Sequence, residues 1–131
     1  MIELLLTFAI QVGGFQEMCV KTECPVPIVM QADLGVKQGE YSWKNPDRVL
    51  IDKTLVEGSV EWNAAVVHEL VHYLQYLAGT YNSSMDCALK VEKQAYMVSE
   101  KYWASKGVEK EFGTHLFSVA MSCIKDYEHQ Q

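Results

Sequence analysis

The sequence is poor in several features that would point to whole classes of protein. Its 17 acidic residues outnumber its 11 Lys and Arg residues, and the basic residues form no cluster. This argues against nucleic acid or an anionic membrane as a partner. The apolar run at residues 4–10 is far shorter than the ~20 residues of a membrane-spanning helix. Internal repeats and low-complexity linkers are also lacking, so we expect one domain over residues 1–131.

Cysteine is scarce too, with four residues at Cys19, Cys24, Cys87 and Cys123. No two of them have CxxC spacing, which argues against a zinc cluster built from thiolates. An even number of cysteines is typical of an exported protein with one or two disulfides, and four allow three full pairings. We therefore expect a periplasmic or secreted protein, with buried free thiols as the alternative. The first residues do not resemble an intact signal peptide, because they have no positively charged stretch.

One short motif, His68-Glu69-Leu70-Val71-His72, is the most informative feature that the chain does have. On a helix, the four-residue spacing places the two imidazole rings on one face, one above the other. Two neutral histidines at this spacing can bind one zinc ion at about 2.0–2.1 Å. Glu69 then lies beside the metal, where it can take a proton from a water molecule that the metal activates. The motif predicts a zinc-dependent hydrolase.

A five-residue motif with two free positions also occurs by chance, so its surroundings matter. Residues 60–74 are apolar nearly all round, which is typical of a buried helix. Burying two histidines and a glutamate costs several kcal/mol unless they have partners. A bound metal ion supplies a partner for all three side chains, which favours a metal site over an accidental match.

The third zinc ligand has to come from outside the motif, because catalytic zinc sites usually have three protein ligands and one open position. The extended motif that adds a third histidine is excluded, since it needs Gly and His where this chain has Gln75 and Ala78. Glu92, twenty positions after His72, is the candidate.

The signals for where the helices end and begin support this choice of Glu92. Gly79 is a natural end for the histidine-bearing helix. A second helix over residues 84–107 then places Glu92 about two turns from its start. The alternative is that Glu92 belongs to a solvated helix face together with Lys90 and Lys93.

The remaining sequence predicts a mixed α+β layout. An amphipathic helix comes first, then a small sheet, and then three helices. Ser59 is the expected N-cap of the metal-binding helix. The expected elements are a helix near residues 2–10, strands over 26–30, 39–43 and 48–51, a helix that begins after Ser59 and ends near Gly79, and helices over 84–107 and 110–127.

The pattern HELVH followed by Glu92-x-x-Ala95-Tyr96 on the next helix resembles the gluzincin zinc metallopeptidases. The length of the chain is similar to minimal, single-domain gluzincins. More narrowly, the pattern together with Cys87 and Trp103 resembles a family of small bacterial HExxH proteins, and this likeness covers about residues 41–106. The resemblance implies a minimal zincin-like α+β domain in which a small sheet and flanking helices pack around the HExxH helix. It also implies that one strand, 41–43 or 48–51, borders the cleft and binds an extended peptide. Tyr41 and Trp43 could line this cleft or belong to the core.

From the residues and the resemblance together, we expect peptide-bond hydrolysis at a zinc ion held by His68, His72 and Glu92, with Glu69 as general base. The developing oxyanion needs a further donor. Gluzincins use a Tyr or a His for this, and the candidates in this chain are Tyr96 and His115.

Two further expectations concern the surroundings of the site. Ser99 and Asn63 are candidates for the groups that hydrogen-bond to the ligand histidines. A binding module that holds zinc without turnover is the competing function, and a chain without any metal is a third interpretation. Retention of Glu69 argues against the binding module, because a site that only holds a metal needs ligands and no base.

Overall fold

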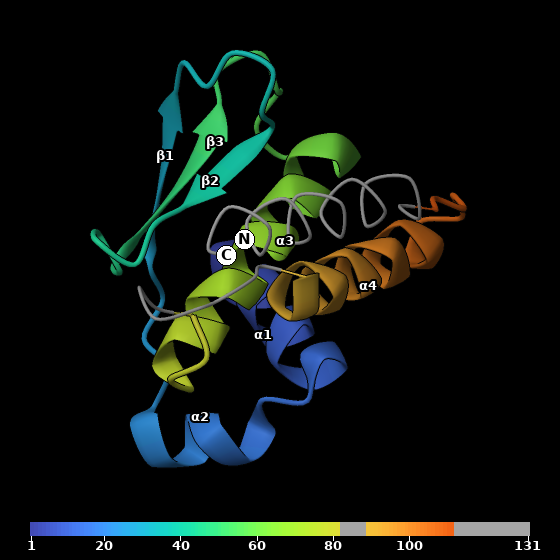
Figure 1. Cartoon of the computed structure of the whole chain (residues 1–131). Coiled ribbons are helices and arrows are strands. Elements are labelled where there is room, and N and C mark those ends of the chain that lie inside the picture. The colour runs from blue at the N-terminus through green and yellow to red at the C-terminus, as the bar shows by residue number, and fades with distance from the viewer. Residues whose placement is uncertain (82–88, 112–131) are drawn as a thin grey trace, which may run out of the picture.

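The fold is organised around one long helix, α3 (Val60–Leu77), as Figure 1 shows. The computed structural model describes residues 1–81 and 89–111, and it has the α+β composition expected from the sequence. A small sheet lies along one side of α3, and two other helices pack against the opposite side of α3 (Figure 1). The other elements are α1 (Ile2–Gly13), α2 (Gln16–Thr22), β1 (Ile28–Ala32), β2 (Gly39–Tyr41), β3 (Arg48–Asp52) and α4 (Leu89–Ser105).

The central helix α3 begins and ends where the sequence predicts. The Ser59 hydroxyl accepts a hydrogen bond from the Trp62 main-chain N–H at 3.1 Å, which confirms Ser59 as the N-cap. Every residue from Trp62 to Gln75 except His68 is buried, as the apolar pattern predicts. Beyond the last turn, Gly79 adopts a positive φ of 81°, a conformation that few other residues tolerate.

The sheet has the strand order β1-β3-β2, with β1 parallel and β2 antiparallel to β3. Val49 and Ile51 of β3 are fully buried, while Leu50 between them is only partly buried. This alternation shows that one face of the sheet packs on the core. Because β3 is central, β2 is an outer strand of the described sheet, and it packs against α3.

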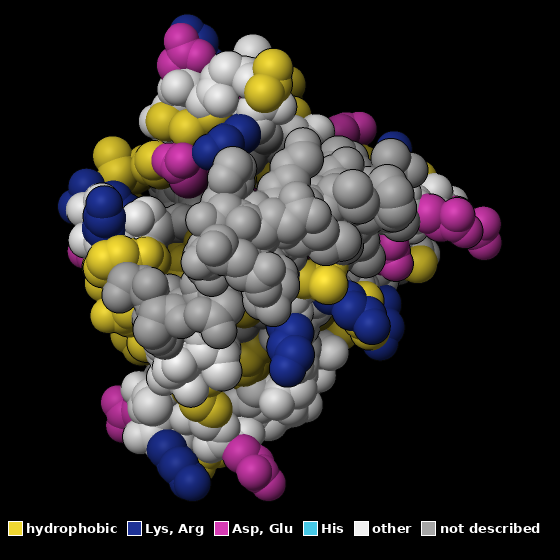
Figure 2. All heavy atoms as spheres, viewed as in Figure 1, with side chains coloured by type: hydrophobic (Ala, Val, Ile, Leu, Met, Phe, Trp, Pro, Cys, Tyr) yellow, Lys and Arg dark blue, Asp and Glu magenta, His cyan; other side chains and the backbone are white. Residues whose placement is uncertain are grey.

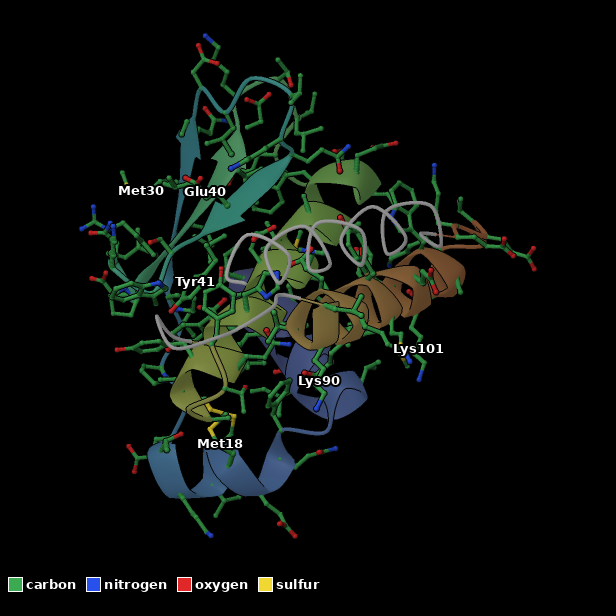
Figure 3. All side chains as sticks on the ribbon, in the orientation of Figure 1. Met18, Met30, Glu40, Tyr41, Lys90 and Lys101 are labelled. Carbon is green, nitrogen blue, oxygen red and sulfur yellow. A yellow bond between two sulfur atoms is a disulfide. The ribbon has the colours of Figure 1, made fainter. Side chains whose placement is uncertain are left out.

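The N-terminal region differs from the expected single helix. Leu5, Leu6 and Ala9 of α1 are buried, as the amphipathic pattern predicts. A second helix, α2, follows after a short break; the sequence did not predict it, because none of its residues is buried to create a periodic pattern. The structure pairs Cys19 with Cys24 in a disulfide beside Met18, visible as a yellow bond in Figure 3.

Several expected features can be compared only in part. The first strand begins at Ile28 rather than at residue 26, and it extends to Ala32. Helix α4 lies inside the predicted range 84–107. The predicted helix over 110–127, His115, Cys87 and Cys123 lie outside the described residues, apart from the first two positions of that helix.

The surface seen in Figure 2 carries charged side chains of both signs. In Figure 2, Lys and Arg side chains are spread over the visible face and mixed with Asp and Glu rather than gathered in one patch. None of the described helices has both the length and the apolar character that crossing a bilayer requires.

Candidate metal centre

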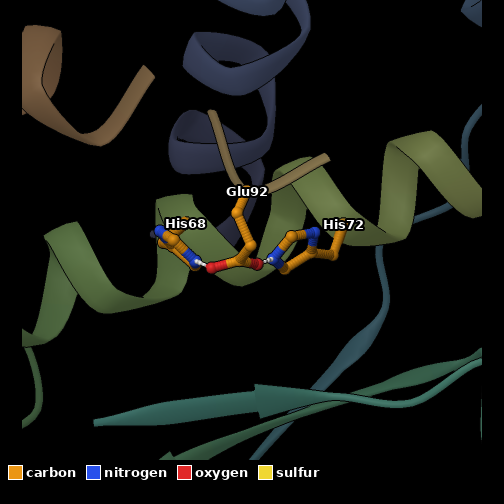
Figure 4. A group of neighbouring side chains, drawn as sticks. All are labelled: His68, His72 and Glu92. Atoms are coloured by element: carbon orange, nitrogen blue, oxygen red, sulfur yellow. Dashed lines mark ion pairs between the residues drawn. The ribbon is translucent and has the colours of Figure 1, made fainter. Parts of the chain in front are cut away.

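His68, His72 and Glu92 come together between α3 and α4, and their ligand atoms all lie within 4.8 Å of one another. The two histidines project from the same face of α3, and Glu92 reaches them from the first turn of α4. Figure 4 shows the Glu92 carboxylate between the two rings. Its Oε2 lies 3.6 Å from His68 Nε2, and its Oε1 contacts His72 Nε2 directly. The packing of α4 on α3 thus brings together residues that are far apart in the sequence.

This donor set fits a metal ion. Two imidazole nitrogens and one carboxylate oxygen form a common three-ligand zinc set, and such sets leave a fourth position open. Ligand atoms of tetrahedral zinc lie about 3.4 Å apart, given metal–ligand distances of about 2.1 Å. The His68–Glu92 distance of 3.6 Å is close to this value. The cluster of His68, His72 and Glu92 can therefore bind a metal ion.

The orientation of His72 is fixed by a chain of hydrogen bonds behind the ring. His72 Nδ1 lies 2.8 Å from Gln75 Oε1. The Gln75 amide nitrogen donates to the Val91 carbonyl at 3.0 Å and to Gln94 Oε1 at 2.8 Å, and Gln94 donates to the Gly13 carbonyl at 3.0 Å. With Nδ1–H donating to Gln75, the Nε2 lone pair of His72 is free for a metal.

Gln75, and neither of the two expected residues, supports the ligand histidine. Asn63 donates to the Tyr102 hydroxyl at 3.0 Å, and Ser99 is 3.5 Å from the Ala64 carbonyl, so the predicted roles of Asn63 and Ser99 are wrong. A signal for Gln75 was present in the sequence. It lies three residues after His72 on the same helix, a spacing that brings side chains into contact.

Glu69 lies beside the metal-binding cluster without belonging to it. Its carboxylate is 3.9 Å from His68 Nε2, and the residue is only 7% exposed. Burial raises the pKa of Glu69, although the neighbouring rings of His68 and His72 work in the opposite direction. The structure thus places a buried carboxyl with a high proton affinity next to the three candidate ligands.

Glu92 and the neighbouring histidines change each other's pKa values. Burial by itself raises the pKa of Glu92, but hydrogen bonds from His68 and His72 outweigh it and hold the pKa well below its usual range. Burial by itself lowers the pKa of His72, and the Glu92 hydrogen bond together with the charge of Glu69 reverses this, so the pKa of His72 is raised. The site therefore favours a negative Glu92 facing a positive partner, which is the charge arrangement that suits a bound cation.

A cleft of about 650 Å³ opens over the cluster, between β2 and the helices α3 and α4. Tyr96, one of the two predicted oxyanion donors, lines this cleft, with its ring centroid 4.5 Å from that of His68. Tyr41 also lines the cleft, whereas Trp43 is not among its lining residues. Gly39 and Tyr81, which the sequence analysis did not single out, are part of the cleft wall as well.

Tyr81 is held in a defined position at this wall. Its ring centroid lies 4.9 Å from that of His72, and its hydroxyl donates to the Tyr41 carbonyl at 3.0 Å. Burial and the charges of the nearby carboxylates raise the pKa of Tyr81 to about 12. No sequence motif marks Tyr81, since its place depends on how the segment after α3 turns back toward the sheet. Comparison of the chain with known protein families, curated proteins and solved structures finds no match.

Proposed function

We propose that this chain is a zinc-dependent peptidase of the minimal gluzincin type, with a zincin-like fold. The observation that carries the proposal is the position of Glu69, a buried carboxyl beside the three ligands that is not needed to hold the metal. Burying such a group has a cost, which a binding site would avoid. A general base, by contrast, has to lie in this place.

Different residues of the chain have different roles in the proposed hydrolysis of a peptide bond. His68, His72 and Glu92 would hold a zinc ion, which would supply a Lewis acid for water and for the scissile carbonyl. Glu69 takes the proton of the attacking water and delivers it to the leaving amine. The raised pKa of Glu69 suits this role, because a carboxyl that holds the proton for part of the cycle must not be too acidic.

Tyr96 is our candidate for the donor that stabilises the developing oxyanion. It lines the same cleft as the candidate metal ligands, and its ring lies against that of His68. Burial raises the pKa of Tyr96, and the charges of Glu92 and Glu69 add to this, so the phenol stays protonated and able to donate near neutral pH.

The test is cleavage of an unbiased peptide mixture by the zinc-loaded protein, read by mass spectrometry beside the Glu69→Gln variant. We expect products from the wild type alone. The amide of the Glu69→Gln variant cannot accept the proton of the attacking water, and the substitution leaves His68, His72 and Glu92 unchanged. Glu61→Gln is the matched control, since Glu61 lies on the same helix and is exposed; this variant should cleave like the wild type.

The other outcomes separate the competing interpretations. Zinc bound at one ion per chain without any product would favour a binding module that holds the metal without turnover. Purified protein that neither contains nor takes up a metal would contradict both functions. Equal turnover by wild type and Glu69→Gln would remove Glu69 from the mechanism.

A further inference from the structure

We propose that Tyr81 closes one end of the cleft, so that the site cleaves peptides close to their amino-terminal end; this rests on the peptidase function proposed above. Tyr81 reaches from the helix to the sheet. Its ring lies 4.9 Å from the His72 ring of α3 and 5.4 Å from the Tyr41 ring of β2, measured between centroids. Its hydroxyl donates to the Tyr41 carbonyl at 3.0 Å. The side chain therefore bridges the two walls between which a peptide would have to pass.

The same hydrogen bond shortens the strand edge that a substrate could use. The Gln38 carbonyl accepts from Asp52 N–H at 2.9 Å. In antiparallel pairs the bonded residues alternate, so the main-chain groups of Gly39 and Tyr41 point to the free edge of β2. Tyr81 occupies the Tyr41 carbonyl there. A peptide added along this edge can therefore form main-chain hydrogen bonds with Gly39. At Tyr41 the carbonyl that would accept its next N–H already accepts from Tyr81.

The position of Glu69 shows how little room remains on this side. Gly39 lies directly against the Glu69 side chain. Tyr41 follows two residues later, which is about 7 Å along a strand. The space between the general base and the Tyr81 bridge therefore holds about two residues of an extended peptide.

The opposite end of the cleft has no comparable bridge among the described residues. Its lining there includes Val36, which is fully exposed, and Lys37, whose side chain is 64% exposed. Trp103 of α4 is partly exposed on the facing wall. Among the described residues, the two sides of the metal centre therefore differ: Tyr81 crosses the cleft on one side, and no described side chain does so on the other.

Strand direction assigns the closed end to the amino-terminal part of the substrate. β2 runs from Gly39, beside Glu69, to Tyr41, beside Tyr81. A peptide paired antiparallel to β2 runs the other way, and antiparallel pairing is the more stable arrangement. Its amino-terminal residues then meet Tyr81, and its carboxyl-terminal residues lie toward Val36 and Lys37.

The experiment maps cleavage positions in the peptide mixture for the zinc-loaded wild type and for Tyr81→Ala. We expect wild-type cleavage within about two residues of the amino terminus. In Tyr81→Ala the share of interior bonds should rise about tenfold, the scale on which one excluded group changes specificity. Tyr81→Phe should keep the terminal preference, because the ring that blocks the path remains. Tyr76→Ala is the control, since Tyr76 also lies near the Tyr41 ring but does not line the cleft.

The possible cleavage patterns test the role of Tyr81 separately from the peptidase function. Interior bonds cleaved equally by wild type and Tyr81→Ala would overturn the role of Tyr81 while leaving the peptidase function standing. Wild-type cleavage near the carboxyl terminus would overturn the assigned direction. If Tyr81→Ala does not fold, Tyr81→Val replaces it, and wild-type cleavage spread evenly over interior bonds would by itself overturn the closed end. Zinc-loaded protein without products from any variant would overturn the peptidase function and this inference with it.

Discussion

Gly39 lies so close to Glu69 that no side chain fits between them. A Cβ atom at position 39 would stand 2.8 Å from Glu69 Cγ and 3.0 Å from its Oε2. The φ of Gly39 is not positive, so alanine is compatible with the backbone and only the contact forbids it. The edge strand β2 thus lies against Glu69, the proposed general base, and glycine at 39 is what allows the close approach.

Gly39→Ala should therefore reduce turnover without removing the metal. The new methyl group pushes the Glu69 carboxylate aside, and a displacement of about 1 Å can cost about 100-fold in rate. The measurement is kcat/KM on a cleaved peptide together with the zinc content. Gly58→Ala is the control, because Gly58 has a φ of 85° and open space around it, so alanine there strains the backbone without touching Glu69. Similar loss of turnover in both variants would contradict the role of Gly39.

Gln75→Leu should weaken zinc binding. The substitution removes the acceptor 2.8 Å from His72 Nδ1, and the loss of such a support typically costs about 10–100-fold in metal affinity. Competition with a chromogenic chelator measures the dissociation constant. Gln94→Leu is the control, because it removes a partner of the Gln75 amide nitrogen but leaves the acceptor beside His72 Nδ1 in place, and it should change the affinity much less. Unchanged affinity in Gln75→Leu would show that the ring of His72 is held by other contacts.

The main elements of the fold could be predicted because their signals are local. Short stretches of sequence are enough to predict the Ser59 cap, the apolar helix after it and the stop near Gly79. The strand order β1-β3-β2 was not predictable in this way, because it depends on how distant segments pair, which periodicity within one segment does not report. The break between α1 and α2 does have a local signal, since Gly14 ends α1 with a positive φ of 79°.

The cluster of candidate metal ligands could be predicted for a chemical reason, since a zinc ion would restrict both residue type and spacing. His68 and His72 follow from the motif, and the ligand count points to Glu92, which the structure brings to them. The surroundings have no such restriction. Gly39 and Tyr81 reach the site through tertiary packing, so a glycine and a tyrosine there look like any others in the sequence.

Tyr96→Phe should lower kcat while leaving KM nearly unchanged. Removing one oxyanion donor typically costs about 100-fold or more in kcat, because the hydrogen bond strengthens in the transition state. The ring, which contacts His68, stays in place, so zinc binding should not change. Tyr76→Phe makes the same change outside the cleft and should have no effect on kcat. Equal rates for wild type and Tyr96→Phe would assign the oxyanion to another donor.

The stability of the metal-free protein should depend on pH through Glu92 and His72. The pKa of Glu92 is lowered on folding, so its contribution is present above its ordinary value of 4.5 and is lost as pH falls through the lowered pKa. The pKa of His72 is raised, so its contribution is present below its ordinary value of 6.5 and is lost as pH rises through the raised pKa. Both contributions are complete only between these two values.

Glu92→Gln isolates this effect, because it removes the charge from the pair and keeps the shape. We expect the difference in free energy of unfolding between wild type and Glu92→Gln to be largest between pH 4.5 and 6.5 and to shrink on both sides. The raised pKa of Glu69 costs stability above pH 4.5; wild type and variant share the part due to burial, which is the largest cause, but the variant loses the part due to the charge of Glu92. Urea unfolding in the presence of a chelator measures the difference, with Glu61→Gln as the control. A difference that stays constant from acidic to alkaline pH would show that the two charges do not interact in the folded protein.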